Sequence, residues 1–380
     1  MTVAILSTIT PVCNAAVGDT KPLIGAQISI LEGDNWRACD KYFQKLKELG
    51  YNTIILRVFH NRNDRFHKLV ERAARKQTPE GVYFSTDQAP IISDILTPAC
   101  KSAHRAGLKI FAWMTTLKAN YDRSLRPQVL YFDKNSGSIK REDNLLDPAS
   151  PENIEFLKKL FQDLAVYPID GILLQDDLIL RHDQGFALVN GTVIPDPEDI
   201  YQFSDIIRAE ITAYRPPFYR WRQQQALTLQ HLANTIFATC RSLRPELLCA
   251  QNIHYELLLN DDWGRDWFAC SKESLTASKA DYLMVMAYQE RIRRELEVPR
   301  EKELSATMLK IFENGLGGEK ERIIFKFETP NQEDSRNRKL KLIATLQKTI
   351  RNARKKGWRD LILTPCNNPE AAALIRYNAE

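Results

Sequence analysis

The chain has 380 residues, of which 44% are hydrophobic and 27% are charged, and its formal net charge at pH 7 is +5. This composition is typical of globular proteins, and no apolar run is long enough to span a membrane. The seven cysteines include no CxxC pair and no Cys/His cluster, which argues against a zinc site or a disulfide framework. We therefore expect a globular protein without a membrane span and without a metal or other cofactor.

Apolar, strand-like segments alternate with helical patterns along the whole chain. The first helical pattern runs from Asn35 to about Leu49, and a later one has Ser150 as N-cap and Pro151 at its first helical position. A long insertion, 181–215, follows the fourth strand-like segment. The predicted strands are 23–31, 52–59, 108–117, 169–180, 246–254, 280–289, 322–329 and 360–366.

Helical sequence between consecutive strands predicts an α/β protein with a parallel (β/α)8 barrel, or TIM-type barrel, in a single domain over residues 22–370. A doubly wound open sheet is the alternative. No GxGxxG motif follows any of the strands, which argues against an open sheet that binds a dinucleotide.

The last helical segment, 336–357, is rich in Lys and Arg. Within it Leu340, Ile343, Leu346 and Ile350 recur at helical spacing. This pattern favours the solvated face of an amphipathic helix over a nucleic-acid surface, so we expect no nucleic-acid partner.

The fourth strand ends in an unusual way, because two adjacent carboxylates, Asp176 and Asp177, follow a strongly apolar run. Buried carboxylates are costly to desolvate, so they lie either in water or in a functional site. If strand alternation continues, Gln175 and Asp177 point into the barrel mouth and Asp176 points sideways. We therefore predict Asp177 as the reacting carboxylate and Asp176 as a neighbour that orients it or tunes its pKa.

Polar and aromatic side chains follow several other strands, and the C-terminal ends of barrel strands are where barrel enzymes place their active sites. Carboxylates that lie among aromatic rings are typical of sites that cleave glycosidic bonds. The six histidines are dispersed and form no HxH or HExxH motif, so metal chemistry fits less well. Besides Gln175, the predicted substrate-binding residues are His60, Trp113, Asn252, Tyr288, Glu328 and Trp267, the last as a stacking platform or a core residue.

The residues alone leave two points open. The second catalytic group is Glu256, Glu290, Glu328 or the acetamido group of the substrate itself. The barrel is either a glycosidase or a non-catalytic module that binds a polysaccharide during export. An esterase is less well supported, because the chain has no GxSxG motif.

Five segments carry a resemblance to a known family: GVYFSTDQAPIISDIL, GLKIFAWMTTL, LDPASPENIEFLKKLFQDLAVYPIDGILLQDDL, DWFACS and ADYLMVMAY. They resemble the C-terminal glycoside-hydrolase domain of the poly-β-1,6-N-acetylglucosamine deacetylase of biofilm export. The similarity extends from about residue 22 to about residue 368 and is most specific over 145–178. It implies a (β/α)8 barrel, endo-cleavage of partly deacetylated polymer, and the exopolysaccharide export machinery as a partner.

The chain departs from that family in two respects. It lacks the TFDDG-type metal motif of the deacetylase domain, so we expect no deacetylase activity. The family reads His-Asp-Asp after the fourth strand, whereas this chain has Gln175 before the two aspartates. Gln can donate and accept hydrogen bonds but carries no charge. Its presence therefore argues against cleavage more than against sugar binding.

The N-terminal segment 1–18 has a short apolar stretch and small residues near Ala15 and Ala16, but no basic region precedes them. We interpret it as an atypical leader. Together with the resemblance, this predicts a periplasmic or secreted protein.

Overall fold

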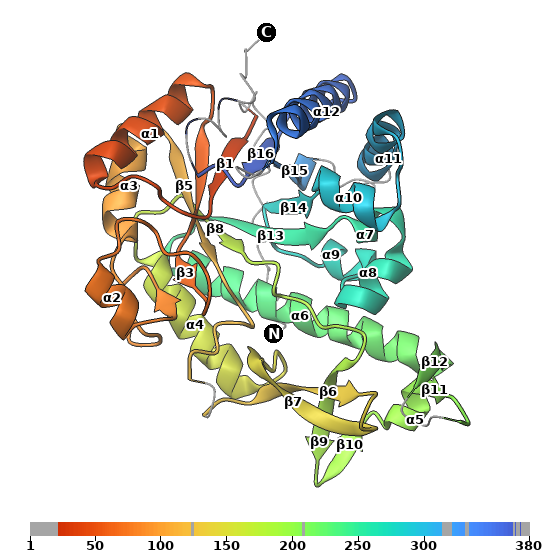
Figure 1. Cartoon of the computed structure of the whole chain (residues 1–380). Helices are drawn as coiled ribbons and strands as arrows, with labels where there is room; N and C mark the ends of the chain where they lie inside the picture. Colours follow the sequence, from red (N-terminus) through yellow and green to blue (C-terminus); the bar gives the residue numbers. More distant parts are fainter. Residues whose placement is uncertain are drawn as a thin grey trace, which may run out of the picture.

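Eight parallel strands close into a barrel in the computed structural model, which describes residues 22–122, 125–206, 210–313, 321–330, 334–367, 369 and 373 (Figure 1). The first strand pairs with both the second and the last, so the sheet has no free edge. The predicted barrel and its eight strands are confirmed, and the open sheet is excluded. Around the barrel the strands are β1 (Ile24–Ile28), β2 (Thr53–Arg57), β5 (Lys109–Met114), β8 (Gly171–Leu174), β13 (Leu248–His254), β14 (Tyr282–Met286), β15 (Ile323–Glu328) and β16 (Leu361–Thr364). The predicted leader, residues 1–18, lies outside the described residues.

Helices cover the outside of the barrel (Figure 1). The predicted cap at Ser150 forms, since its side chain accepts the N–H of Asn153, and the Asn35 side chain caps α1 by accepting the N–H of Ala38. None of the helices in the described part of the chain has the length and apolar composition needed to cross a membrane. The longer helices are α1 (Trp36–Glu48), α3 (Leu96–Arg105), α4 (Pro151–Ala165), α6 (Pro216–Leu243), α11 (Glu301–Glu313) and α12 (Arg336–Lys355). The shorter ones are α2 (Arg72–Gln77), α5 (Pro197–Ile200), α7 (Glu256–Leu259), α8 (Asp261–Phe268), α9 (Lys272–Thr276) and α10 (Gln289–Glu295).

The basic helix α12 is amphipathic, but its inner face differs from the predicted one. Leu342, Leu346 and Ile350 are buried, whereas Leu340 is 58% exposed. The buried residues recur every four positions, and Leu340 lies about 200° around the helix from Leu342, because each residue turns the helix by about 100°. The prediction that Leu340 belongs to the inner face was therefore wrong by half a turn.

The barrel interior has an apolar lower layer and a polar upper layer. The lower layer packs eight apolar side chains, seven from barrel strands and Leu23 from the residue just before β1: Leu23, Ile55, Phe111, Leu173, Ala250, Met284, Ile324 and Ile362. Because alternate residues of a strand face the same side, the residues two positions further along form the next layer. In seven strands these are Arg57, Trp113, Gln175, Asn252, Met286, Lys326 and Thr364. The barrel therefore changes from an entirely apolar layer to a largely polar one just below its C-terminal mouth.

Two insertions at this end of the barrel pair with each other. One follows β5 and contains β6 (Gln128–Asp133) and β7 (Ser138–Leu146). The other follows β8 and contains β9 (Gln184–Val189) and β10 (Thr192–Ile194). They form an antiparallel sheet in the order β10-β9-β6-β7, which lies beyond α6 at the lower edge of Figure 1. We call it the accessory sheet. Two-stranded sheets also form from β3 (Phe59–His60) with β4 (Gly81–Val82), and from β11 (Tyr201–Phe203) with β12 (Ile211–Tyr214).

Candidate active site

A cleft of about 460 Å³ opens at the C-terminal mouth of the barrel, between the ends of β8 and β13 and the accessory sheet. We call it the mouth cleft. Both adjacent aspartates line it, at the end of the barrel where this fold places catalytic groups. Its lining residues are Asn61, Lys118, Glu142, Asn144, Leu145, Gln175, Asp176, Asp177, Ile179, Arg181, Gln184, His254 and Arg291.

Asp177 is only 5% exposed, and protein donors engage both of its carboxylate oxygens. The hydroxyl groups of Thr115 and Thr116 donate to it at 2.6 and 2.8 Å. The backbone N–H groups of Thr116 and Lys118 donate at 2.9 and 2.7 Å. Burial raises the pKa of Asp177, and these hydrogen bonds act in the opposite direction. Asp177 thus connects the turn after β8 to the segment after β5.

Asp176 is half-buried, and its carboxylate has no hydrogen bond or ion pair to any other described residue. Its charge acts on Lys326 and on Tyr288, and its backbone lies near His254. Lys326, Tyr288 and His254 lie on or just after β15, β14 and β13, respectively. The Asp176 carboxylate is therefore near the ends of these three strands. Strand alternation does not extend to this position, because β8 ends at Leu174 and the chain turns at 176–177.

Lys326 lies in the polar layer below Asp176 and is 1% exposed. Its ammonium is 2.8 Å from Oδ1 of Asn252 and 5.9 Å from the ring centroid of Trp113. Burial lowers the pKa of Lys326 to about 7, and the nearby Asp176 opposes this shift. The layer below the mouth therefore contains a buried amine whose charged form is disfavoured by desolvation.

Trp113 and Gln175 also belong to the floor of the mouth. The indole N–H of Trp113 donates a hydrogen bond to Oε1 of Gln175, and its ring packs edge-on against Phe59 at 5.7 Å. The Gln175 amide is therefore oriented by the floor and presents its remaining groups to the cleft. The structure brings three of the predicted site residues together in this layer, namely Trp113, Gln175 and Asn252, and Asp176 lies above them.

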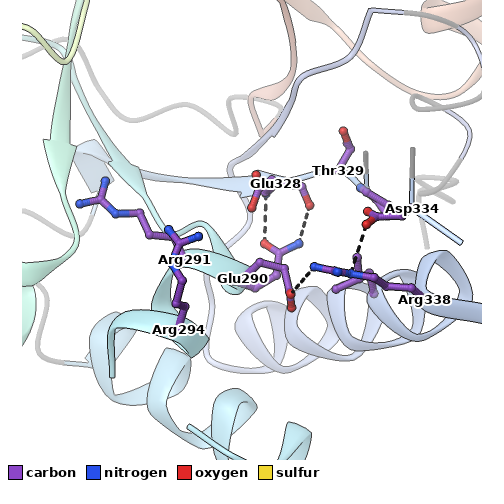
Figure 2. Close-up of a pocket in the computed structure, with 10 residues that line it drawn as sticks. Glu290, Arg291, Arg294, Glu328, Thr329, Asp334 and Arg338 are labelled. Atoms are coloured by element: carbon purple, nitrogen blue, oxygen red, sulfur yellow. Dashed lines mark hydrogen bonds and ion pairs between the residues drawn. The ribbon is translucent and has the colours of Figure 1, made fainter. Parts of the chain in front are cut away.

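A second, smaller pocket of about 160 Å³ adjoins the mouth cleft, and Arg291 lines both. We call it the Glu328 pocket. Figure 2 shows Glu290 and Asp334 both reaching Arg338, and Glu328 at the end of β15. The backbone N–H of Glu328 donates to Oε1 of Gln289 at 3.0 Å, and the Gln289 amide donates to the Glu328 carbonyl. The Gln289 side chain therefore bonds both backbone groups of Glu328, as a neighbouring strand would.

The candidates for the second catalytic group differ in their partners. Glu256 forms an ion pair with Arg291 at 2.9 Å, and Glu290 forms one with Arg293 at 2.8 Å. Glu328 has no ion pair to a described residue, and burial followed by the charge of Glu290 raises its pKa. Tyr288, whose pKa is raised by burial, feels the charges of both Asp176 and Glu328 and so lies between the two sites.

Five predicted site residues line neither pocket: Trp113 and Asn252, which lie in the layer below the cleft, Tyr288, which follows β14, and His60 and Trp267. His60 is 1% exposed, stacks on Phe66 at 3.7 Å and bonds the Tyr83 hydroxyl at 2.9 Å, while its neighbour Asn61 reaches the cleft. Burial lowers the pKa of His60 to about 4. Trp267 is 50% exposed on α8, which excludes a core role and leaves the stacking platform as a prediction.

Several cleft residues were not predicted as site residues. Glu142, Asn144 and Gln184 come from the accessory sheet, whose pairing has no signature in the sequence. His254 could have been found, because it follows Asn252 by two positions on one strand and so shares its face. The others are Asn61, Lys118, Leu145, Ile179, Arg181 and Arg291. Among the described residues, no group of three or more His, Cys, Asp or Glu side chains is arranged to hold a metal ion.

A closed (β/α)8 barrel with carboxylates in a polar cleft at its C-terminal mouth has the arrangement found in barrel glycoside hydrolases. The sequence comparison identifies the family within that class. The model of hypothetical glycosyl hydrolase family 13 matches residues 35–362, and the chain belongs to that family. No curated protein matches the chain.

Solved structures share the fold. The glycoside hydrolase domain of PgaB (BpsB) from Bordetella bronchiseptica has a TM-score of 0.66 and 16% identity, over 95% of this chain and 100% of that one. A β-galactosidase from Marinomonas ef1 has a TM-score of 0.54 and 10% identity, over 93% and 59%. The endo-β-1,4-mannanase from Thermotoga petrophila has a TM-score of 0.52 and 12% identity, over 96% and 78%. At these identities the likeness shows the fold alone.

Proposed function

We propose that the protein is an endo-acting glycosidase that cleaves partly deacetylated poly-β-1,6-N-acetyl-D-glucosamine or a similar amino-sugar exopolysaccharide. The observation that carries the proposal is the Asp176 carboxylate, which is accessible in the mouth cleft and unpaired among the described residues. The family and the similarity to the PgaB domain support glycosidase chemistry, and the motif around 145–178 supports the polymer. Deacetylase activity is not part of the proposal.

We assign the chemistry to Asp176 and a positioning role to Asp177, which reverses the order predicted from strand alternation. Asp177 would have to break charge-assisted hydrogen bonds to Thr115, Thr116 and Lys118 before it could act on a substrate. Asp176 has no such bonds to give up. Glu328 and the acetamido group of the substrate are the remaining candidates for the second group, because Glu256 and Glu290 are held in ion pairs.

A non-catalytic polysaccharide-binding barrel is the second candidate function. The observation that favours it is Gln175, which stands where the similar family has His and whose amide oxygen is occupied by the Trp113 indole. A neutral amide cannot transfer a proton to or from a neighbouring carboxylate.

Product release from the polymer by Asp176→Asn and by the parent chain separates the two functions. We expect the parent to release oligosaccharides, and Asp176→Asn to lose at least about 100-fold in rate while retaining affinity. Asp199→Asn, on the exposed part of α5, is the matched control and should keep the parent rate. Polymer binding without product from the parent would support the binding barrel, and full activity of Asp176→Asn would contradict our assignment.

We also propose that the protein acts in the periplasm or outside the cell, together with exopolysaccharide export proteins. The apolar segment 1–18 and the resemblance described above support this location. Cell fractionation followed by N-terminal sequencing of the recovered protein tests it. Recovery of the uncleaved chain from the cytoplasmic fraction alone would contradict it.

A further inference from the structure

His254 ends β13 and lines the mouth cleft beside the Asp176 backbone. It is 7% exposed, and neither of its ring nitrogens makes a hydrogen bond of normal distance and angle to a described residue, although the Asp176 backbone is near enough to favour its protonated form weakly. Its ring lies parallel to that of Phe268, with centroids 3.9 Å apart and an interplanar angle of 6°. The imidazole is therefore held in a fixed orientation by stacking, while both of its polar atoms are unsatisfied.

The other buried histidines differ in this respect. His67 uses both ring nitrogens, since Nδ1 accepts the N–H of Leu31 at 2.9 Å and Nε2 bonds the carbonyl of Arg57 at 3.0 Å. His60 uses one, in its bond with Tyr83. Leaving a buried polar group unsatisfied costs about 1–3 kcal/mol, and most such groups in folded proteins have a partner. At His254 both ring nitrogens lack such a partner, and the residue lines the mouth cleft.

The chemistry of the ring restricts what it can bind. Burial, together with the charges of Arg291 and Arg181, lowers the pKa of His254 to about 3, so the ring is neutral near pH 7. A neutral imidazole offers one N–H donor and one lone-pair acceptor. A hydroxyl group can both donate and accept, whereas an ammonium can only donate and a carboxylate can only accept.

We propose that His254 binds a hydroxyl group of the sugar unit that lies against Asp176, and so selects substrates by a neutral group and not by their charge. This inference rests on the proposed function, because it places a sugar in the mouth cleft. Phe268, which is 4% exposed, orients the imidazole for this contact. The sugar hydroxyl would satisfy a polar group that the fold leaves without a partner. The unsatisfied imidazole would thus lower the stability of the free protein and favour binding of the sugar.

The test replaces His254 by Phe in the full chain, which keeps the stack on Phe268 and removes both polar atoms. We expect the Tm to stay the same or rise, because an unsatisfied polar group is removed. We expect affinity for a pentasaccharide of β-1,6-linked glucosamine and N-acetylglucosamine to fall about 5–100-fold by calorimetry, in the Asp176→Asn background. His254→Gln, which retains a donor and an acceptor, should recover part of this loss.

Two control variants complete the design. His60→Phe removes a hydrogen bond that exists in the fold and should lower the Tm. His231→Gln, on the exposed face of α6, should change neither quantity. A fall in Tm for His254→Phe as large as that for His60→Phe would overturn the inference, and so would unchanged affinity. If the parent binds no such oligosaccharide, the proposed polymer is wrong, and the Tm comparison still decides whether His254 is unsatisfied in the fold.

Discussion

Asp177 accepts the backbone N–H of Lys118 at 2.7 Å, and this bond joins the segments that follow two neighbouring barrel strands, β5 and β8. Lys118 and Asp177 both line the mouth cleft, so the bond also fixes part of its wall. Asp177, which was predicted to be the reacting carboxylate, thus joins the segments after β5 and β8.

Asp177→Asn should destabilise the fold and Asp176→Asn should not. The first variant replaces an acceptor-only group by an amide that turns an N–H₂ toward one set of donors. We expect its free energy of unfolding to fall by about 2–4 kcal/mol, as for hydrogen bonds to a buried charged group. Urea denaturation of both variants measures this. If Asp177→Asn unfolds like the parent yet loses all turnover, Asp177 is the reacting carboxylate and our assignment is reversed.

Lys326→Met should stabilise the fold at low pH more than at high pH. The folded pKa of Lys326, about 7, lies below its ordinary value of 10.5, so folding penalises the charged amine. Below about pH 7 the amine is charged in both states and the penalty is complete; it disappears as the pH rises toward 10.5. The stability gained by the Met variant should therefore shrink over this range, by an amount on the order of a few kcal/mol.

Urea denaturation of the parent and of Lys326→Met at several pH values across this range gives the comparison. Lys341→Met, at an exposed position on α12, is the control and should show no such trend. A stability difference that does not change with pH would mean that Lys326 keeps an ordinary pKa in the folded protein.

Arg181→Gln should strengthen binding of partly deacetylated polymer. Arg181 is exposed at the mouth cleft, has no ion pair to another described residue, and lies 5.1 Å from the Phe268 ring centroid. Its charge repels the free amines of such a polymer. Removing it should raise the affinity about 2–5-fold at low salt, and the gain should vanish at high salt.

Calorimetry with partly deacetylated and with fully acetylated polymer measures this effect, and Arg351→Gln on α12 serves as the control. The fully acetylated polymer should bind equally well to Arg181→Gln and to the parent. A loss of affinity for both polymers would show instead that Arg181 donates hydrogen bonds to the sugar.

Arg222→Met should destabilise the fold by removing the hydrogen bonds that hold residues 180–181, which follow the aspartate pair. Arg222 is fully buried in α6 and donates to the carbonyls of Leu180 at 2.7 Å and Arg181 at 3.1 Å. The variant leaves these buried carbonyls unsatisfied, so the free energy of unfolding should fall by about 1–3 kcal/mol or more. Denaturation and polymer affinity are the measurements, with the exposed Arg220→Met as the matched control. Unchanged stability would contradict the role given to Arg222.

The barrel was predictable because each strand is a local apolar run, and the eight runs alternate with helical sequence. The position of the aspartate pair at the mouth of the barrel was predictable. The direction in which each of the two carboxylates points was not. Alternation places Asp177 toward the mouth only while the strand continues, and β8 ends at Leu174. His60 was misplaced for a related reason, since β3 leaves the barrel and pairs with β4. The accessory sheet joins segments about 50 residues apart, and the chain contains no local pattern for that pairing.

The accessory sheet has its own apolar cluster, which includes Phe132, Phe186 and Tyr201, separate from the barrel interior. It is built from loop insertions, and it supplies Glu142, Asn144 and Gln184 to one wall of the mouth cleft. Substitutions in this wall need not disturb the packing of the barrel. The wall of the cleft and the barrel floor therefore have separate cores, and a change of residue in one can be made without repacking the other.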